Sequence, residues 1–136
     1  MNRELKFMAW HSEQKRMFKV HALGKDWLTE ETIDGIDIGN NCFGIDCGIE
    51  YIKVMQFTGF KLKNDVEIYD GYILGDWADV DGKMIQSRVP VFFDEITGQW
   101  MLDMSSMKDR SYSVSLFSDL QEYDYELLGN IYENPL

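Results

Sequence analysis

Short runs in which apolar and polar side chains alternate constrain the fold of this chain most strongly. The clearest run lies near the carboxy terminus, where Tyr123, Tyr125 and Leu127 alternate with Asp124 and Glu126. A period of two is typical of a β-strand, because successive side chains of a strand point to opposite faces. Similar runs recur along the chain between turn-forming residues, so the sequence predicts a mainly β fold, arranged as a small barrel or sandwich.

The first two runs predict a β-hairpin, with strands over residues 4–10 and 16–22 and a polar turn between them. Residues 26–48 are rich in glycine and predict a loop with short strands. Further strands are expected over residues 50–57, 66–69, 72–74, 89–93, 99–102 and 112–116. Gly59 is expected to end the strand before it, in a turn with a positive φ angle. Pro90 lacks an N–H group, so its strand is expected to lie at a sheet edge or to start there.

Two further stretches are interpreted as turns. Residues 76–83 contain Asp81-Gly82, a pair that favours a tight turn, and the whole stretch is predicted to be turn-rich. Ser118 and Gln121 have the spacing of a helix capping box, but little helical sequence follows them. At most one helical turn is therefore predicted there.

Charge is placed unevenly along the 136 residues, whose net charge is −11. Residues 1–25 carry six basic and two acidic groups, whereas residues 112–136 carry five acidic groups and no basic one. The acidic surface is interpreted as a source of solubility; the alternative is that the basic start pairs with an acidic surface in the same chain or a neighbour. Glu122, Asp124 and Glu126 are predicted to share one strand face, as exposed charges rather than as a group with a raised pKa. Because a general nucleic-acid binder needs a dominant basic patch, strong binding of free DNA is not expected.

The residues predict no catalytic site, no cofactor site and no metal site. Cys42 and Cys47 lack the spacing of a zinc knuckle and are interpreted as two reduced thiols. Asp76, Asp79 and Asp81 fit either a weak contact with a divalent cation or a solvated turn, and the turn is favoured.

The sequence also predicts a cytoplasmic protein. No uninterrupted apolar run reaches the roughly 18 residues of a membrane span. The first ten residues lack the apolar core of a secretory signal.

Three further segments stand out by their order and content. They are RELKFMAW at residues 3–10 with KRMF at 15–18, MQFTGFKLKNDVEIYDG at 55–71, and GNIYENP at 129–135. Together they resemble the YopX family of phage and prophage proteins, and they span nearly the whole chain. Asp65 stands where the family usually shows glycine, and Tyr72 stands where it usually shows an acidic residue.

The resemblance implies one YopX-like unit over residues 1–136, with a hairpin and loop region over about 1–54 and an SH3-like barrel over about 55–136. It implies a phage or prophage setting in a bacterial cell, and it supplies no catalytic residue and no substrate. The signature residues are Trp10, Gln56, Thr58, Gly59, Lys63, Asn64, Tyr69, Gly71, Gly129, Asn130, Tyr132, Asn134 and Pro135. Tyr69 is interpreted as a core residue, and Asn130 and Asn134 as side chains that bond backbone groups at turns.

Two classes of function follow from these observations. The first is a non-catalytic module that binds another protein or itself. The second is a nucleic-acid-linked role, either direct binding through the basic residues 1–25 or mimicry of DNA by an acidic surface. An enzyme is a third alternative, since a constellation assembled in space is invisible in the sequence.

Overall fold

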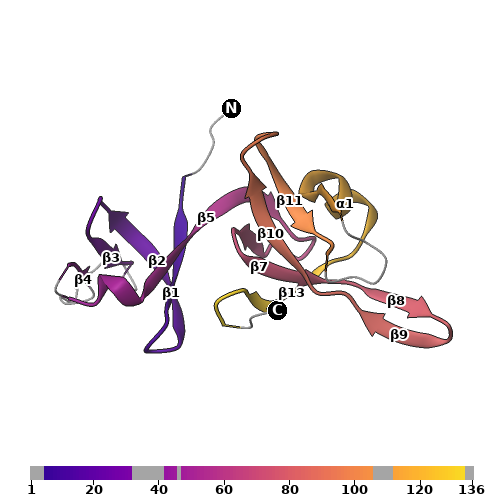
Figure 1. The fold of residues 1–136 in the computed structure, drawn as a ribbon, viewed down its shortest axis with the longest axis horizontal. Helices are drawn as coiled ribbons and strands as arrows, with labels where there is room; N and C mark the ends of the chain where they lie inside the picture. Colours follow the sequence, from indigo (N-terminus) through magenta and orange to yellow (C-terminus); the bar gives the residue numbers. More distant parts are fainter. Residues whose placement is uncertain (1–4, 32–41, 46, 106–111, 134–136) are drawn as a thin grey trace. The chain divides into compact units, whose positions relative to one another are not determined.

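The computed structural model describes residues 5–31, 42–45, 47–105 and 112–133 (Figure 1). Short antiparallel strands dominate these residues, and they hold one α-helix, so the prediction of a mainly β fold is confirmed. The chain divides into two compact units, Met1–Gln56 and Phe57–Leu136, which we call unit 1 and unit 2.

Unit 1 is built on the hairpin that the sequence predicts. Its elements in chain order are β1 (Phe7–His11), β2 (Arg16–Leu23), β3 (Leu28–Glu30), β4 (Cys42–Phe43), the 3₁₀-helix η2 (Ile49–Tyr51) and the first half of β5 (Ile52–Lys61). The strand order is β4-β3-β2-β1-β5, and Ala9 lies opposite Phe18 in the hairpin. The buried core consists of Ala9, Phe18, Leu28, Phe43 and Ile52. The expected loop with short strands is thus confirmed by β3 and β4, while residues 32–41 lie outside the described part.

Unit 2 contains the rest of β5 and a second sheet. Its further elements are β6 (Glu67–Tyr69), β7 (Tyr72–Gly75), β8 (Trp77–Val80), β9 (Lys83–Gln86), β10 (Val89–Asp94), β11 (Gln99–Asp103), β12 (Ser113–Ser115), α1 (Leu116–Glu122) and β13 (Glu126–Asn130). The second sheet has the order β12-β11-β10-β7-β13, β6 pairs with β5, and β8 and β9 form a two-stranded sheet. The core consists of Leu62, Ile68, Leu74, Val89, Val91, Trp100, Leu102, Met104 and Leu116. The sheets are open in the described residues, so the structure does not confirm an SH3-like barrel.

Gly59 does not end its strand, as the sequence led us to expect. It lies inside β5 with a φ of 91°, where the pairing of β5 with β6 shifts register between Phe57 and Lys61. The G1 type of β-bulge places a glycine in the left-handed backbone that some turns also require, and glycine adopts it without steric cost. The positive φ was therefore predicted correctly, and the turn was not.

The stretch predicted as turn-rich, residues 76–83, instead forms most of a hairpin. Asp81 and Gly82 have φ angles of 53° and 82°, as a type I′ turn requires, so the tight turn itself is confirmed. The residues on both sides of that turn pair in register as β8 and β9. In Figure 1 this hairpin projects away from the five-stranded sheet of unit 2.

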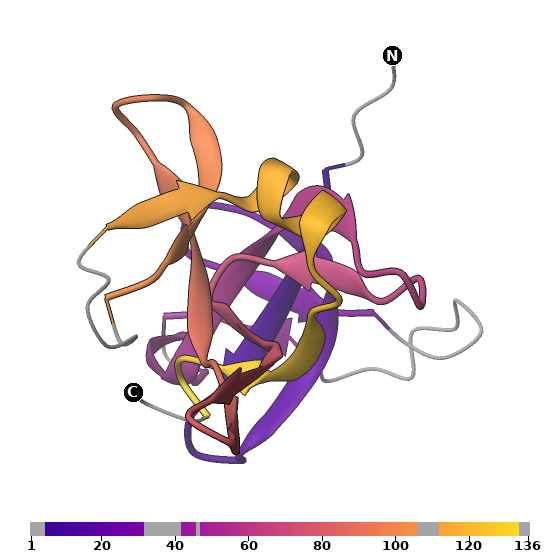
Figure 2. The same ribbon diagram turned by 90° about the vertical axis from the view of Figure 1, so that its right-hand side faces the viewer.

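The helix α1 is longer than the single turn that the sequence predicts. Ser115 is its N-cap, and its hydroxyl accepts a hydrogen bond from the Ser118 amide at 3.4 Å. The cap therefore lies three residues before the predicted one, and the chain passes from β12 directly into the helix (Figure 2). Leu116 is fully buried, so packing rather than helix propensity holds this short helix.

In the described part of the chain no helix is long and apolar enough to cross a membrane.

Pro90 is the second residue of β10, which lies inside its sheet between β7 and β11. Pro90 pairs with Ile73 of β7, and pairing with β11 begins one residue later, at Val91. The predicted edge strand is wrong, and the strand starts at Val89, one residue before the position predicted for its start.

Candidate functional site

The signature residues of β5 shape the backbone of unit 2. Thr58 is buried, and its hydroxyl donates to the Ile68 carbonyl at 2.8 Å and accepts from the Phe60 amide at 3.1 Å. These two bonds flank the bulge at Gly59. The bulge at Gly59 leaves backbone groups without strand partners, and the hydroxyl of the adjacent Thr58 forms hydrogen bonds with two of them, the Ile68 carbonyl and the Phe60 amide.

The next signature residues build the turn between β5 and β6. The Asn64 side chain accepts from the Val66 amide at 3.3 Å, and Asp65 adopts a φ of 67°. Aspartate tolerates this left-handed conformation better than most residues, so it can replace the glycine that is usual at this position. Lys63 forms an ion pair with Asp124 at the surface. The side-chain contacts of this turn are all exposed, so the turn lies at the surface.

Tyr69 and Gly71 hold the turn between β6 and β7. The ring of Tyr69 is buried 5.4 Å from the ring centres of both Phe57 and Tyr72, which agrees with a core role. Gly71 has a φ of 82°; its amide donates to the Val91 carbonyl and its carbonyl accepts from the Ile131 amide, both at 2.8 Å. This glycine therefore joins the turn to β10 and to the carboxy-terminal segment.

Titratable groups around this turn have altered pKa values. Burial raises the pKa of the Asp70 carboxyl, and a backbone hydrogen bond from Gly71 opposes that shift. Burial, and then the nearby charge of Glu67, raises the pKa of Tyr72 to about 12. Burial, and then Asp70, raises the pKa of Tyr132. At neutral pH the phenols are therefore protonated hydrogen-bonding groups and not nucleophiles.

The carboxy-terminal signature ends β13 in a turn. Asn130 is buried, and its side-chain oxygen accepts from the amides of Tyr132 and Glu133 at 2.9 and 2.8 Å. Gly129 lies at the register shift in the pairing of β13 with β7. Asn134 and Pro135 lie outside the described residues. The Asn130 side chain thus bonds backbone groups at a turn, in the way that the sequence indicated.

The two signature residues of unit 1 lie in paired strands. Trp10 is buried in β1 between Met17 and Lys53, and Gln56 lies opposite Phe7. The signature residues that the structure describes therefore form strands, bulges and turns. Their contacts explain the fold.

The carboxylates and cysteines singled out in the sequence are dispersed. Glu122 ends α1 and Glu126 begins β13, so the prediction that they share a strand face with Asp124 is wrong. The reason is that Glu122, which the alternating pattern assigned to a strand, belongs to the helix. The Asp76 and Asp79 side chains accept from the amides of Trp77 and Gly82, which agrees with a solvated turn. Within the described residues no three His, Cys, Asp or Glu side chains are grouped to hold a metal ion. Both cysteines are free and exposed.

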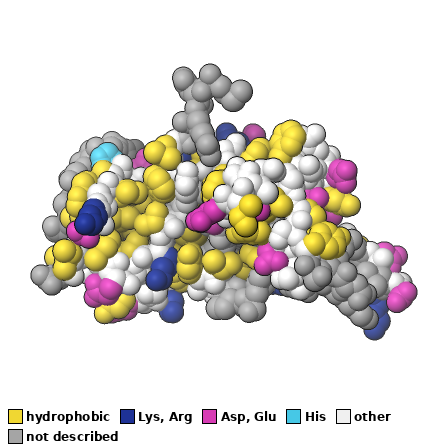
Figure 3. All heavy atoms as spheres, turned by 45° about the horizontal axis from the view of Figure 1, so that its top comes forward, with side chains coloured by type: hydrophobic (Ala, Val, Ile, Leu, Met, Phe, Trp, Pro, Cys, Tyr) yellow, Lys and Arg dark blue, Asp and Glu magenta, His cyan; other side chains and the backbone are white. Residues whose placement is uncertain are grey.

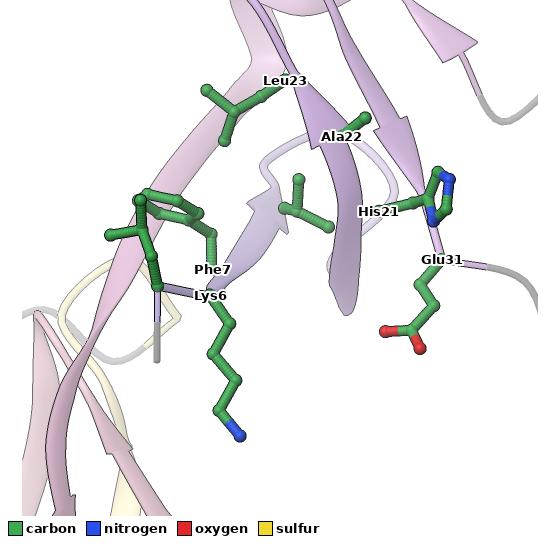
Figure 4. Close-up of a pocket in the computed structure, with 8 residues that line it drawn as sticks. Lys6, Phe7, His21, Ala22, Leu23 and Glu31 are labelled. Carbon is green, nitrogen blue, oxygen red and sulfur yellow. The ribbon is translucent and has the colours of Figure 1, made fainter. Parts of the chain in front are cut away.

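A groove in unit 1 lies where β1 and β2 separate. Their pairing ends at Met8 and Lys19, after which β1 stays paired with β5 and β2 with β3. The groove has a volume of about 520 Å³ and is lined by Leu5, Lys6, Phe7, Val20, His21, Ala22, Leu23 and Glu31. Figure 4 shows Phe7 and Leu23 on one side of it and His21 and Glu31 on the other. Apolar walls with a few polar groups are the composition of a contact surface.

The β8–β9 hairpin exposes large apolar side chains in unit 2. The exposed fractions are 53% for Trp77, 62% for Met84 and 47% for Ile85. Trp77 lies opposite Gln86, and Asp79 lies opposite Met84, so these four side chains share one face, which we call the Trp77 face. Figure 3 shows hydrophobic and acidic side chains intermixed on the surface that it presents.

Glu126 of β13 is fixed to the base of this hairpin. Its Oε1 atom accepts from Trp77 Nε1 at 3.2 Å and from Gln86 Nε2 at 2.7 Å. Sequence reasoning missed this surface because it assigned the residues around Asp81-Gly82 to turns. The available indication was that an Asp-Gly pair favours the type I′ turn that joins two strands directly.

These features define a class: mainly β proteins of two compact units, whose signature residues set strand bulges and turns. The chain belongs to the YopX family, since the family described as YopX protein matches residues 6–136. The resemblance inferred from the three sequence segments is thereby confirmed. No curated protein matches the chain.

Two solved structures are similar over nearly the whole chain. Protein EF1440 from Enterococcus faecalis is 25% identical with a TM-score of 0.70, covering 98% of this chain and 97% of that one. Protein yopX from Bacillus subtilis is 17% identical with a TM-score of 0.57, covering 96% of this chain and 94% of that one. The second likeness shows the fold alone.

Proposed function

We propose that this protein is a non-catalytic module that binds another protein or a second copy of itself, and that the β8–β9 hairpin is its binding element. The observation that carries the proposal is the exposure of Trp77, Met84 and Ile85 on a two-stranded hairpin. A hairpin of two strands is only marginally stable alone, and exposed apolar patches mark interaction sites. Tryptophan is enriched among the residues that dominate binding energy, and methionine adapts to varied surfaces.

The proposal is tested by capture of partners with the full chain and two matched variants. Met84→Ser removes an exposed apolar side chain from the hairpin, and Ile96→Ser removes one from the β10–β11 loop, where Ile96 is 96% exposed. We expect wild type and Ile96→Ser to retain the same partner, or to self-associate equally, and Met84→Ser to lose that property. Equal behaviour of the two variants would contradict the proposal, provided that both melt at the wild-type temperature.

A nucleic-acid-linked role is the second proposal, and the net charge of −11 favours its acidic-mimic form. Direct binding through the basic start has less support, because the Arg16 guanidinium is paired with Glu30 and lies 4.9 Å from the ring centre of Phe18. Titration with duplex and single-stranded DNA at near-physiological salt separates the two forms. Micromolar binding of duplex or single-stranded DNA would favour direct contact. Absence of DNA binding would agree with a protein partner.

The cellular setting is also a proposal. We infer that residues 1–136 together work as one YopX-like unit, made of unit 1 and unit 2, in the bacterial cytoplasm and in a phage or prophage context. The family resemblance supports this setting, and both similar solved structures come from bacteria.

A further inference from the structure

The Trp77 face presents two large apolar side chains as one patch. Trp77 lies opposite Gln86 and Met84 lies two residues before Gln86 in β9, so the indole and the thioether are diagonal neighbours. Diagonal neighbours on one face of a hairpin lie close enough for long side chains to touch. A partner therefore meets both apolar side chains on the same face of the hairpin.

Two negative side chains, Asp79 and Glu126, lie at this patch. Asp79 lies on the same face, opposite Met84, and Glu126 is held against Trp77 at the hairpin base. Both hydrogen bonds to Glu126 end on Oε1, and Oε2 has no partner among the described residues. Lys83 is the neighbour of Met84 in β9 and so points to the opposite face.

These charges decide between possible occupants. A second copy would place Asp79 and Glu126 against the same carboxylates, and like charges across an interface are costly. The net charge of −11 adds a repulsion between copies at long range. A partner surface with lysine or arginine side chains around an apolar pocket would instead attract the carboxylates of this face and the net negative charge of the chain.

We infer that the Trp77 face docks on a protein surface in which basic side chains surround an apolar pocket. The inference rests on the proposed function and adds the chemistry of the partner. Trp77 and Met84 fill the pocket, and the carboxylates of Asp79 and Glu126 meet the basic rim. Such pairs steer association, which is therefore faster at low salt.

The probe is a library of displayed random peptides, selected on the full wild-type chain and counter-selected on Trp77→Ser/Met84→Ser. Met84→Ser alone serves as a second counter-selection, because its mostly exposed side chain contributes little to folding. We expect the hairpin-dependent peptides to carry Lys or Arg beside a large apolar residue. Asp79→Asn/Glu126→Gln should weaken their binding about tenfold, as expected for two exposed charge pairs, whereas Glu95→Gln, in the β10–β11 loop, should not.

Other outcomes overturn the inference in distinguishable ways. Hairpin-dependent peptides without basic residues would refute the partner chemistry and leave the proposed function standing. Self-association that Met84→Ser abolishes would do the same. A selection that yields no hairpin-dependent peptide would count against both the inference and the proposed function.

Discussion

Replacing Gly75 with alanine tests whether β7 lies as close to the Ser87 backbone and to Leu128 of β13 as the structure describes. An added Cβ atom would lie 2.4 Å from Leu128 Cδ1 and 2.6 Å from the backbone oxygen of Ser87. The leucine side chain can rotate away, but the backbone oxygen cannot, so β7 must shift. Overpacking of this kind costs about 1–3 kcal/mol of the free energy of unfolding. For a chain of this length the melting temperature should fall by about 3–10 °C.

Thermal unfolding followed by circular dichroism measures this loss. Gly44→Ala is the matched control, because a Cβ atom there meets no described atom within 4 Å. The double variant Gly75→Ala/Leu128→Ala should not restore stability, since the contact with Ser87 remains and the leucine packing is lost. If Gly75→Ala melts at the same temperature as Gly44→Ala, β7 does not lie this close to the Ser87 backbone and to Leu128, and our description of unit 2 is wrong.

Three further predictions concern the same unit. Truncation before Tyr125 removes β13 and should abolish the cooperative unfolding of unit 2 in calorimetry; an unchanged transition would contradict this. Asn130→Ala leaves two backbone amides without their acceptor and should lower the free energy of unfolding in urea by about 1–3 kcal/mol. Asn64→Ala, at an exposed turn, should lower it less. Equal losses of unfolding free energy would refute the buried role of Asn130. Asp70 has a raised pKa in the folded protein, so above its ordinary value of 3.8 ionisation costs the folded state more than the unfolded state. Asp70→Asn should therefore raise the free energy of unfolding at neutral pH and leave it unchanged well below pH 3.8, and a gain of equal size at both pH values would exclude this cause.

The elements that the sequence predicted well are strands that pair with their neighbour in the chain. β1 and β2 alternate clearly and are joined by a short polar segment, and β10 and β11 flank a loop in which Gly98 adopts a φ of 69°. In both hairpins the pattern, the turn and the pairing partner are local in the sequence. Local information was therefore sufficient.

The elements that were missed depend on distant contacts. Gly59 fits a turn or a bulge equally well by its own chemistry, and only the register of β5 with β6 decides between them. α1 is held by the burial of Leu116 in a core whose other members come from several strands. Trp77 donates to a carboxylate that is 49 positions away, at Glu126, and no short pattern connects the two.

Site-specific photo-crosslinking in cells that naturally carry this protein tests the central claim most directly. A photoreactive residue at position 84 replaces Met84 on the Trp77 face, and the same residue at position 96 replaces the more exposed Ile96. We predict that position 84 forms a crosslink to a protein with a basic surface and that position 96 does not. Equal crosslinking from both positions, or none from position 84, would contradict a binding role for the hairpin.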